Sequence, residues 1–193
     1  FLYNTLDTIY MLARINKEET TMKMIQALSK YLRLSLSKGN DIVTVADELE
    51  NVRSYLQIQE IRNENLFTYT VDCEVEPEKT YVLKLILQPL VENAIKYNRP
   101  NGSVTVSVKE KNGQAMILVK DTGIGISPEN QKKIFDPFFR VDKSRSRAMG
   151  GAGLGLALVD SIAREHGGSV KVLESNEKGS IIALMLPVSS LKN

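Results

Sequence analysis

Three polar side chains on one predicted helix have the spacing of a ligand-binding face. The stretch from Leu90 to Tyr97 reads as helical, and Asn93, Lys96 and Tyr97 lie three and four residues apart, so they project from one side. An amide oxygen is a hard ligand for Mg²⁺, and an ammonium group balances phosphate charge, so this face suits a Mg²⁺-bound polyphosphate. Taken alone, the same spacing is equally typical of a helix with a solvated polar face.

A carboxylate followed by two glycines forms a second candidate site. Asp121, Gly123 and Gly125 come directly after a predicted strand. A carboxylate at a strand end can accept a hydrogen bond from an exocyclic amine, and glycines allow a ligand to approach the backbone closely. By itself the pattern Asp-x-Gly-x-Gly is weak, because a tight turn has the same composition.

A glycine-rich segment, residues 150–155, leads directly into another predicted helix. Backbone amides at a helix N-terminus form an anion site where phosphates are favoured. The segment is not a P-loop, because it lacks Gly-Lys-Ser/Thr. It is not a Rossmann motif either, because no strand leads into it.

The segment between the two glycine clusters joins aromatic residues to a basic run. Residues 135–140 read Phe-Asp-Pro-Phe-Phe-Arg, and their aromatic side chains either belong to the core or anchor a mobile loop. Residues 140–147 contain one acid and four cations: Arg140, Lys143, Arg145 and Arg147. Such a run is usually a solvated loop. Between two glycine clusters, it also has the charge that a lid over a triphosphate needs.

The elements that must position these residues fall into two regions. Residues 1–64 have a helical period and predict three helices. Gly39 and Asn40 end the second of these helices, and Thr44 can cap the third, with Asp47 completing a capping-box pattern. The predicted buried faces are Leu2, Leu6, Ile9 and Ala13; Met24, Ile25, Leu28, Tyr31, Leu32 and Leu36; and Val45, Leu49, Val52 and Leu56.

Residues 65–193 predict an α/β layer. The predicted strands are 67–71, 104–108, 115–119, 170–173 and 181–186, with a hairpin turn at Asn112-Gly113. The predicted helices run from about Glu78 to Tyr97 with a kink at Pro89, from Ser127-Pro128 onward, and from Leu154 to His166. The fold class is therefore α+β, with a helical region followed by a mixed or antiparallel sheet covered by helices.

The composition is that of a globular protein and excludes several classes. Of 193 residues, 42% are hydrophobic, and 25 basic against 23 acidic residues leave a net charge of +2, so direct nucleic-acid binding is not expected. Cys73 is the only cysteine, which excludes an intramolecular disulfide and favours a reducing compartment. The longest apolar run, 181–188, is far shorter than the ~20 residues that cross a bilayer. Because the chain opens at Phe1, within a predicted helix, we expect a fragment of a longer protein.

Four of these segments, in this order, resemble the N, first glycine, F and second glycine boxes of sensor histidine kinases. They are residues 92–97, 121–125, 135–139 and 151–156. Five further segments resemble the YesM/LytS-type branch of that family: residues 1–6 (FLYNTL), 32–36 (LRLSL), 48–50 (ELE), 55–59 (YLQIQ) and 87–93 (LQPLVEN). The resemblance covers essentially the whole chain.

The resemblance implies an ATP-binding sandwich of the Bergerat type behind a helical dimerisation and phosphotransfer region, with ATP and Mg²⁺ as cofactors. The implied site residues are Asn93 as Mg²⁺ ligand; Lys96, Tyr97 and Arg140 at the phosphates; Asp121 at the adenine amine, in a pocket shaped by Gly123 and Gly125; Gly151, Gly153, Leu154 and Gly155 as phosphate-binding amides; and Glu92 as a general base.

A histidine kinase also needs a phosphorylatable imidazole. His166 is the only histidine, and its position before Gly167-Gly168 favours a polar residue at a helix C-terminus over an acceptor. In the YesM/LytS branch the acceptor directly precedes the segment that resembles residues 1–6, so it would lie one residue before Phe1. We therefore expect the chain to bind ATP but not to phosphorylate itself.

The resemblance also implies partners. They are a second copy, paired through the N-terminal helices in a four-helix bundle, and the receiver domain of a response regulator, whose aspartate takes the phosphoryl group. The parent protein would be membrane-anchored, with this portion in the bacterial cytoplasm.

Two other hypotheses remain open. One is a related ATPase of the mismatch-repair or heat-shock type, which the N-terminal helices and residues 135–139 argue against. The other is a degenerate kinase that acts as a scaffold, which the intact Asn93, Lys96 and Asp121 argue against.

Overall fold

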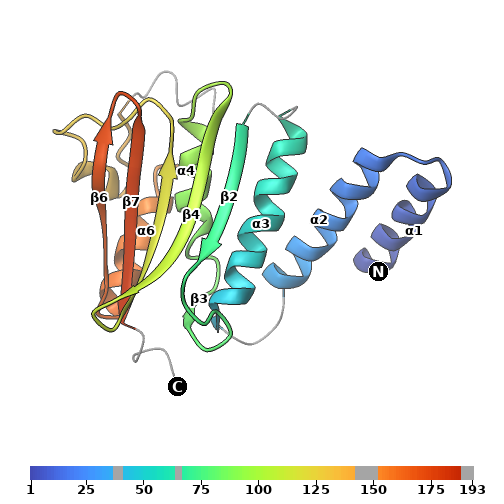
Figure 1. The fold of residues 1–193 in the computed structure, drawn as a ribbon, viewed down its shortest axis with the longest axis horizontal. Coiled ribbons are helices and arrows are strands. Elements are labelled where there is room, and N and C mark those ends of the chain that lie inside the picture. The colour runs from blue at the N-terminus through green and yellow to red at the C-terminus, as the bar shows by residue number, and fades with distance from the viewer. Residues whose placement is uncertain (37–40, 64–66, 142–151, 188–193) are drawn as a thin grey trace.

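A mixed β-sheet with helices over one face forms the main body of the protein, and a pair of helices extends from its side (Figure 1). The computed structural model describes residues 1–36, 41–63, 67–141 and 152–187. The predicted α+β class is confirmed.

The sheet has five strands in the order β2-β4-β5-β7-β6. β2 pairs with β4 in parallel, whereas the other neighbours are antiparallel. Every predicted strand is present, and the turn at Asn112-Gly113 has the positive φ angles, 54° and 73°, that a two-residue hairpin needs. The strands are β2 (Phe67–Cys73), β4 (Gly102–Lys111), β5 (Gln114–Asp121), β6 (Ser169–Asn176) and β7 (Gly179–Pro187).

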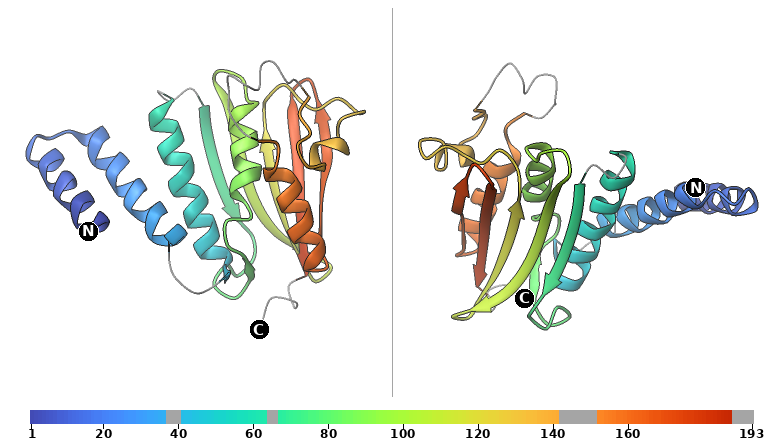
Figure 2. Two further views of the ribbon diagram at one scale, coloured as in Figure 1. Left: turned by 180° about the vertical axis from the view of Figure 1, so that it is seen from behind. Right: turned by 45° about the horizontal axis from the view of Figure 1, so that its top comes forward.

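The core lies between this sheet and the helices that cover it. Helices α4 (Gln88–Lys96) and α6 (Gly155–Glu165) lie over one face, as the view from behind shows (Figure 2). Alternation along β4 buries Val104, Val106 and Val108 in this core. Helix α6 ends at Glu165, with His166 as its C-cap and Gly167 following at a φ of 69°, close to the predicted end.

Helix α3 (Val45–Arg62) packs into the same core. It follows the short strand β1 (Ile42–Thr44), and Thr44 Oγ1 accepts a hydrogen bond from the Asp47 N–H at 3.1 Å, as the capping pattern predicted. Its predicted apolar face is buried: Val45, Leu49, Val52 and Leu56. The predicted division of the chain after residue 64 stays a prediction.

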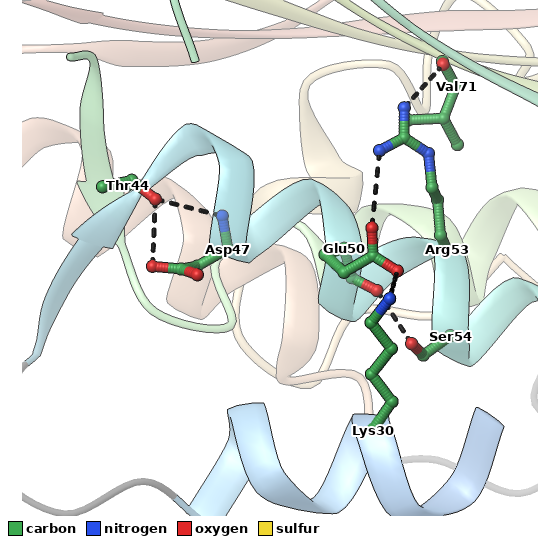
Figure 3. Close-up of polar contacts among 7 residues, drawn as sticks. All are labelled: Lys30, Thr44, Asp47, Glu50, Arg53, Ser54 and Val71. Atoms are coloured by element: carbon green, nitrogen blue, oxygen red, sulfur yellow. Dashed lines mark hydrogen bonds and ion pairs between the residues drawn. The ribbon is translucent and has the colours of Figure 1, made fainter. Parts of the chain in front are cut away.

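Polar contacts join α3 to its neighbours on both sides (Figure 3). Lys30 of α2 (Glu19–Leu36) forms an ion pair with Glu50, which also lies near Arg53. Arg53 in turn donates a hydrogen bond to the Val71 carbonyl of β2 at 3.1 Å. A connected set of charges therefore runs from α2 across α3 to the outermost strand of the sheet.

Helices α1 (Leu2–Ile15) and α2 form a hairpin with a small core of its own, which contains Leu6, Ala13 and Ile25. Two residues of the predicted α1 face, Leu2 and Ile9, are instead 44% and 42% exposed. Within the described part of the chain, no helix has the length and apolar character needed to cross a membrane. The predicted helix end at Gly39-Asn40 lies outside the described residues.

The predicted helix from Glu78 to Tyr97 is wrong in its first half. Residues Tyr81–Leu83 form strand β3, which pairs with β1, and α4 begins only at Gln88. Pro89 therefore lies in the first turn of α4, where its missing N–H costs nothing, and it starts the helix rather than kinking it. The apolar residues on both sides of the boundary are buried, so their spacing alone could not separate strand from helix.

The predicted helix at Ser127-Pro128 is also wrong. Turns follow Pro128, and between residues 128 and 141, where the described stretch stops, the regular structure consists of a short 3₁₀ helix, Lys133–Phe135. Ser127 bonds to the Glu129 and Asn130 side chains, so its hydroxyl stabilises a local turn and does not cap a helix.

Candidate functional site

A cavity of about 570 Å³ opens between α4, the sheet and the N-terminal end of α6. Most of the site residues predicted from the sequence line it: Glu92, Asn93, Lys96, Tyr97, Asp121, Gly125, Arg140, Gly153, Leu154 and Gly155. Asn93 and Asp121, which lie on different elements, therefore share one cavity. Gly123 is not among the residues that line the cavity, and Gly151 lies outside the described residues.

Helix α4 presents its polar side to this cavity because its other side is buried. Leu90, Val91 and Ala94 pack into the core and fix the rotation of the helix. Asn93 Nδ2 donates to the Pro89 carbonyl at 2.7 Å, which turns the amide so that Oδ1 is the atom left for a ligand.

Two cations lie close together at the cavity wall. Partial burial lowers the pKa of Lys96, and the positive charge of Arg140 lowers it further, while Glu92 acts in the opposite direction. The Lys96 ammonium also lies over the Tyr97 ring, 5.6 Å from its centroid. A cation whose protonated form is weakened by a second cation beside it is suited to an anionic ligand that both can contact.

Asp121 ends strand β5 with its carboxylate fixed by backbone donors. Its Oδ1 accepts a hydrogen bond from Gly123 N–H at 2.7 Å, and the Ser180 N–H is a second donor. Burial raises the pKa of Asp121, while these two N–H groups lower it. Val119 and Ile182, which pair across β5 and β7, give the cavity an apolar wall beside this carboxylate.

The glycines after Asp121 are required by the protein's own backbone. A Cβ on Gly123 would lie 2.2 Å from the Tyr97 carbonyl oxygen, and one on Gly125 would lie 2.1 Å from the Asn176 carbonyl oxygen. The Ile124 N–H donates to the same Tyr97 carbonyl at 3.1 Å. The segment is thus held tightly against α4 and β6, whereas the sequence suggested close approach by a ligand.

The aromatic segment and the second glycine cluster touch each other. Phe138 has a φ of 64° and donates its N–H to the Gly153 carbonyl at 2.9 Å, and a Cβ on Gly153 would lie 2.9 Å from the Phe139 carbonyl oxygen. Phe139 lines the cavity, while Phe138 is 70% exposed. The predicted basic residues from 142 to 151 lie outside the described residues.

Sequence reasoning missed Ser180 and Ile182, because their contact with the site depends on the pairing of β5 with β7. It also missed a network behind Asp121, in which the Thr122 hydroxyl joins Asn98 to the Ser103 N–H. Alternation along β7 is the one sequence signal that puts Ser180 and Ile182 on one face.

His166 lies away from this cavity. It is the C-cap of α6, at the opposite end from Gly155, and its Nδ1 is 2.9 Å from the Ile162 carbonyl oxygen of the same helix. This position agrees with the predicted structural role.

The described residues contain no cluster of three or more histidine, cysteine, aspartate or glutamate side chains that could hold a metal ion. A divalent cation here would have to share the Asn93 oxygen with oxygens of a ligand. That donor set fits Mg²⁺, which is commonly bound by few protein oxygens together with phosphates.

Two family profiles match the chain. Residues 79–190 match the family described as "Histidine kinase-, DNA gyrase B-, and HSP90-like ATPase", and residues 1–67 match the family described as "Histidine kinase". Because the first match covers more than half of the chain, the chain belongs to this family of histidine kinases and related ATPases. The second match identifies it as a histidine kinase within that family.

Curated relatives and solved structures agree with this assignment. The signal transduction histidine-protein kinase ArlS of Staphylococcus aureus is 33% identical over 176 residues, which cover 86% of this chain and 38% of ArlS. The chain therefore spans well under half the length of the curated relatives that it matches.

Among solved structures, the catalytic domain of histidine kinase ThkA has a TM-score of 0.63 at 24% identity, covering 79% of this chain and 97% of that one. The mycobacterial sensor histidine kinase MprB has a TM-score of 0.61 at 24% identity, covering 77% and 97%. The Acinetobacter baumannii histidine kinase AdeS has a TM-score of 0.59 at 18% identity, covering 93% and 84%. These similarities show a shared fold.

Proposed function

We propose that this chain is the catalytic portion of a two-component sensor histidine kinase, which binds Mg²⁺-ATP and transfers its γ-phosphoryl group to a histidine. One observation carries the proposal: a single cavity contains two neighbouring cations, Lys96 and Arg140, together with the partly buried carboxylate of Asp121. A purine nucleotide has the matching pair of features, a polyanionic phosphate chain and an amine donor. The cavity volume is also within the usual range for small-molecule sites, about 300–1,000 Å³.

In this proposal the adenine amine donates to Asp121. The two backbone N–H groups on that carboxylate support the role, because they fix its orientation before the ligand arrives. Gly123 and Gly125 shape the pocket by holding the following segment against α4 and β6.

The phosphates face Lys96, Tyr97 and Arg140 on one side. On the other side they meet the amides at the start of α6, where the helix dipole favours an anion. The amide donors proposed there are Gly151, Gly153, Leu154 and Gly155.

Asn93 is the proposed Mg²⁺ ligand, through the oxygen that its hydrogen bond to Pro89 leaves available. When bound, Mg²⁺ neutralises charge that develops on the phosphates during transfer. Glu92, beside Asn93 on α4, is the proposed general base. The acceptor is proposed to be a histidine that directly precedes Phe1.

The remaining assignments concern the whole kinase. We propose that residues 1–64 form the dimerisation and phosphotransfer region and that residues 65–193 form the catalytic domain. We also propose that the protein belongs to the YesM/LytS-type branch. Exposed apolar side chains on α1 support a homodimer through the N-terminal helices: Leu2, Ile9, Leu12 and Ile15. A response regulator receiver domain is the proposed second acceptor, and the parent protein is proposed to be membrane-anchored with this portion in the cytoplasm and without direct nucleic-acid binding.

Titration calorimetry with Mg²⁺-ATP tests the nucleotide site. We expect Asp121→Asn to weaken binding about 10- to 100-fold, because a hydrogen bond to a charged group is worth about 1.5–3 kcal/mol. The matched control is Asp72→Asn, an exposed aspartate on β2 that should keep wild-type affinity. Absence of binding by the wild type, or equal affinity in both variants, would reject the site.

A second assay separates a kinase from an ATPase or a scaffold. Adding the upstream segment with its histidine should produce acid-labile phosphate on the protein, and Asn93→Ala should abolish it. Steady release of inorganic phosphate without a phosphoprotein would favour the ATPase. Nucleotide binding without either product would favour the scaffold.

A further inference from the structure

Two side-chain hydrogen bonds in series lead from α2 to the cavity wall. The Tyr31 hydroxyl donates to Gln88 Oε1 at 3.1 Å, although the two residues are 57 positions apart. Gln88 Nε2 then donates to Glu92 Oε1 at 2.7 Å, one helical turn further along α4. Glu92 also lines the cavity, so the same side chain belongs both to the proposed site and to the contact with α2.

Chemistry allows only one direction for this series. An ionised carboxylate accepts hydrogen bonds and cannot donate them, so Gln88 must turn its NH₂ group towards Glu92. Its carbonyl oxygen then faces Tyr31, which must donate. The carboxylate therefore sets the orientation of the amide, and the tyrosine hydroxyl, by donating to its carbonyl oxygen, holds the amide in place against the carboxylate.

Other contacts fix Tyr31 in the register that the series needs. Lys30, its neighbour on α2, forms an ion pair with Glu50 of α3. Ser35 Oγ lies 3.4 Å from Asn51 Oδ1 one turn later, and the Tyr31 ring packs against Tyr55 with the centroids 6.1 Å apart. A rotation or a slide of α2 relative to α3 would thus move the Tyr31 hydroxyl.

The charge of Glu92 acts on both sides of α4. Burial, followed by the negative charge of Glu92, raises the pKa of Tyr55 to about 12 at the contact with α2. On the cavity side the same charge opposes the lowering of the Lys96 pKa. A change in the position of this carboxylate would therefore change the electrostatic environment of Lys96 in the proposed phosphate site.

We infer that Tyr31 and Gln88 are positioning residues for Glu92, and that displacement of α2 releases this carboxylate from its place beside the reacting groups. The inference rests on the proposed function, because it gives a role to Glu92 in the transfer step. It also gives α2 a direct mechanical connection to the cavity, independent of any contact between α2 and the nucleotide.

Tyr31→Phe tests the inference by removing only the hydroxyl, and Ser35→Ala is the matched control, because it removes another polar contact between α2 and α3. The side-chain amide of Gln88 is followed by NMR in the chain as it stands. Tyr31→Phe should shift its resonances and speed their exchange with solvent, whereas Ser35→Ala should leave them unchanged.

Phosphoryl transfer is measured after the upstream histidine segment is added. Tyr31→Phe should lower the transfer rate about fivefold, the effect of one neutral hydrogen bond, and change the dissociation constant of Mg²⁺-ATP less than about twofold. Gln88→Met should lower the rate at least as much, and adding Tyr31→Phe to it should cause no further loss, because both residues act through one series.

Two results would overturn the inference: wild-type Gln88 resonances and rate in Tyr31→Phe, or an equal loss of rate in Ser35→Ala. Failure of the wild type to bind Mg²⁺-ATP would instead reject the proposed function. In that case the NMR comparison still decides whether Tyr31 holds the Gln88 amide in place.

Discussion

Glu48 Oε1 accepts a hydrogen bond from the backbone N–H of Leu87, the N-cap residue of helix α4. The Leu87 side chain cannot accept a hydrogen bond and so cannot cap the helix. A carboxylate from α3 accepts the hydrogen bond from the backbone instead. The other oxygen of Glu48 accepts from the Leu85 N–H at 2.9 Å, and the side chain is only 2% exposed. The helix that bears Asn93 and Lys96 is therefore anchored on a buried acid.

This buried acid should make stability depend on pH. Burial raises the pKa of Glu48 from 4.5 to about 7, although the N–H groups of Leu87 and Leu85 and the charge of Lys84 lower it. The folded protein therefore holds this proton more tightly than the unfolded chain. The contribution of Glu48 to the free energy of unfolding is fully present below pH 4.5 and is lost as the pH rises through about 7.

Glu48→Gln, which cannot titrate, should therefore gain stability relative to the wild type as the pH rises across this window. The relative change should be on the order of 3 kcal/mol. Urea unfolding at a series of pH values measures it, with the exposed Glu110→Gln as control. A difference between wild type and Glu48→Gln that stays constant with pH would contradict the prediction.

Removing the cap of α3 should weaken the whole sheet domain, because α3 shares its core. Thr44→Ala leaves the Asp47 N–H without its acceptor and should lower the free energy of unfolding by about 1 kcal/mol. Thr44→Ser keeps the hydroxyl and should recover most of the loss. Chemical denaturation of the three proteins gives the comparison, and equal losses in both variants would show that the threonine methyl group matters instead.

Gly123→Ala should disturb the site sterically. Its Cβ would lie 2.2 Å from the Tyr97 carbonyl oxygen and 2.7 Å from Asp121 Oδ1, and this backbone cannot move without shifting α4. We expect a loss of about 1–3 kcal/mol of stability together with weaker Mg²⁺-ATP binding.

Gly113→Ala is the control for this variant. Gly113 has a φ of 73° but no atom within 4 Å of the Cβ position, so alanine there should cost about 1–2 kcal/mol of backbone strain without affecting the nucleotide. Wild-type nucleotide affinity in Gly123→Ala would contradict the steric explanation.

Nucleotide affinity should fall at alkaline pH as Lys96 loses its proton. Because Arg140 lowers the pKa of Lys96, Arg140→Gln should move this fall to higher pH, even though it weakens binding at neutral pH. Titrations of Mg²⁺-ATP between about pH 7 and 10 measure the effect, with the exposed Lys120→Gln as control. An unchanged midpoint in Arg140→Gln would mean that the two cations do not interact.

The sequence predicts those helices and strands in which the buried residues recur with the period of the element itself. Val104, Val106 and Val108 alternate because only one face of β4 meets the helices. The prediction is wrong for the region before Pro89 for the opposite reason. Val82, Ile86 and Leu87 are all buried, so the apolar pattern there fits a strand and a helix equally well.

In the site, residues placed by their own helix or strand could be predicted, whereas residues placed by the pairing of distant strands could not. Asn93 and Asp121 could be predicted because each lies at a recognisable place on its own helix or strand. Ser180 could not, because its N–H reaches Asp121 only through the pairing of β5 with β7, some sixty positions away in the chain. Gly123 was predicted for its place beside the ligand, yet its neighbour is the Tyr97 carbonyl.

The bond from Arg53 to the Val71 carbonyl bears on how these molecules behave at high concentration. Val71 belongs to β2, the terminal strand of the sheet, and terminal strands invite pairing with strands of other molecules. A guanidinium already occupies one acceptor of this border, and α3 lies alongside it. An incoming strand would have to displace both, which protects the protein from aggregation through its sheet edge.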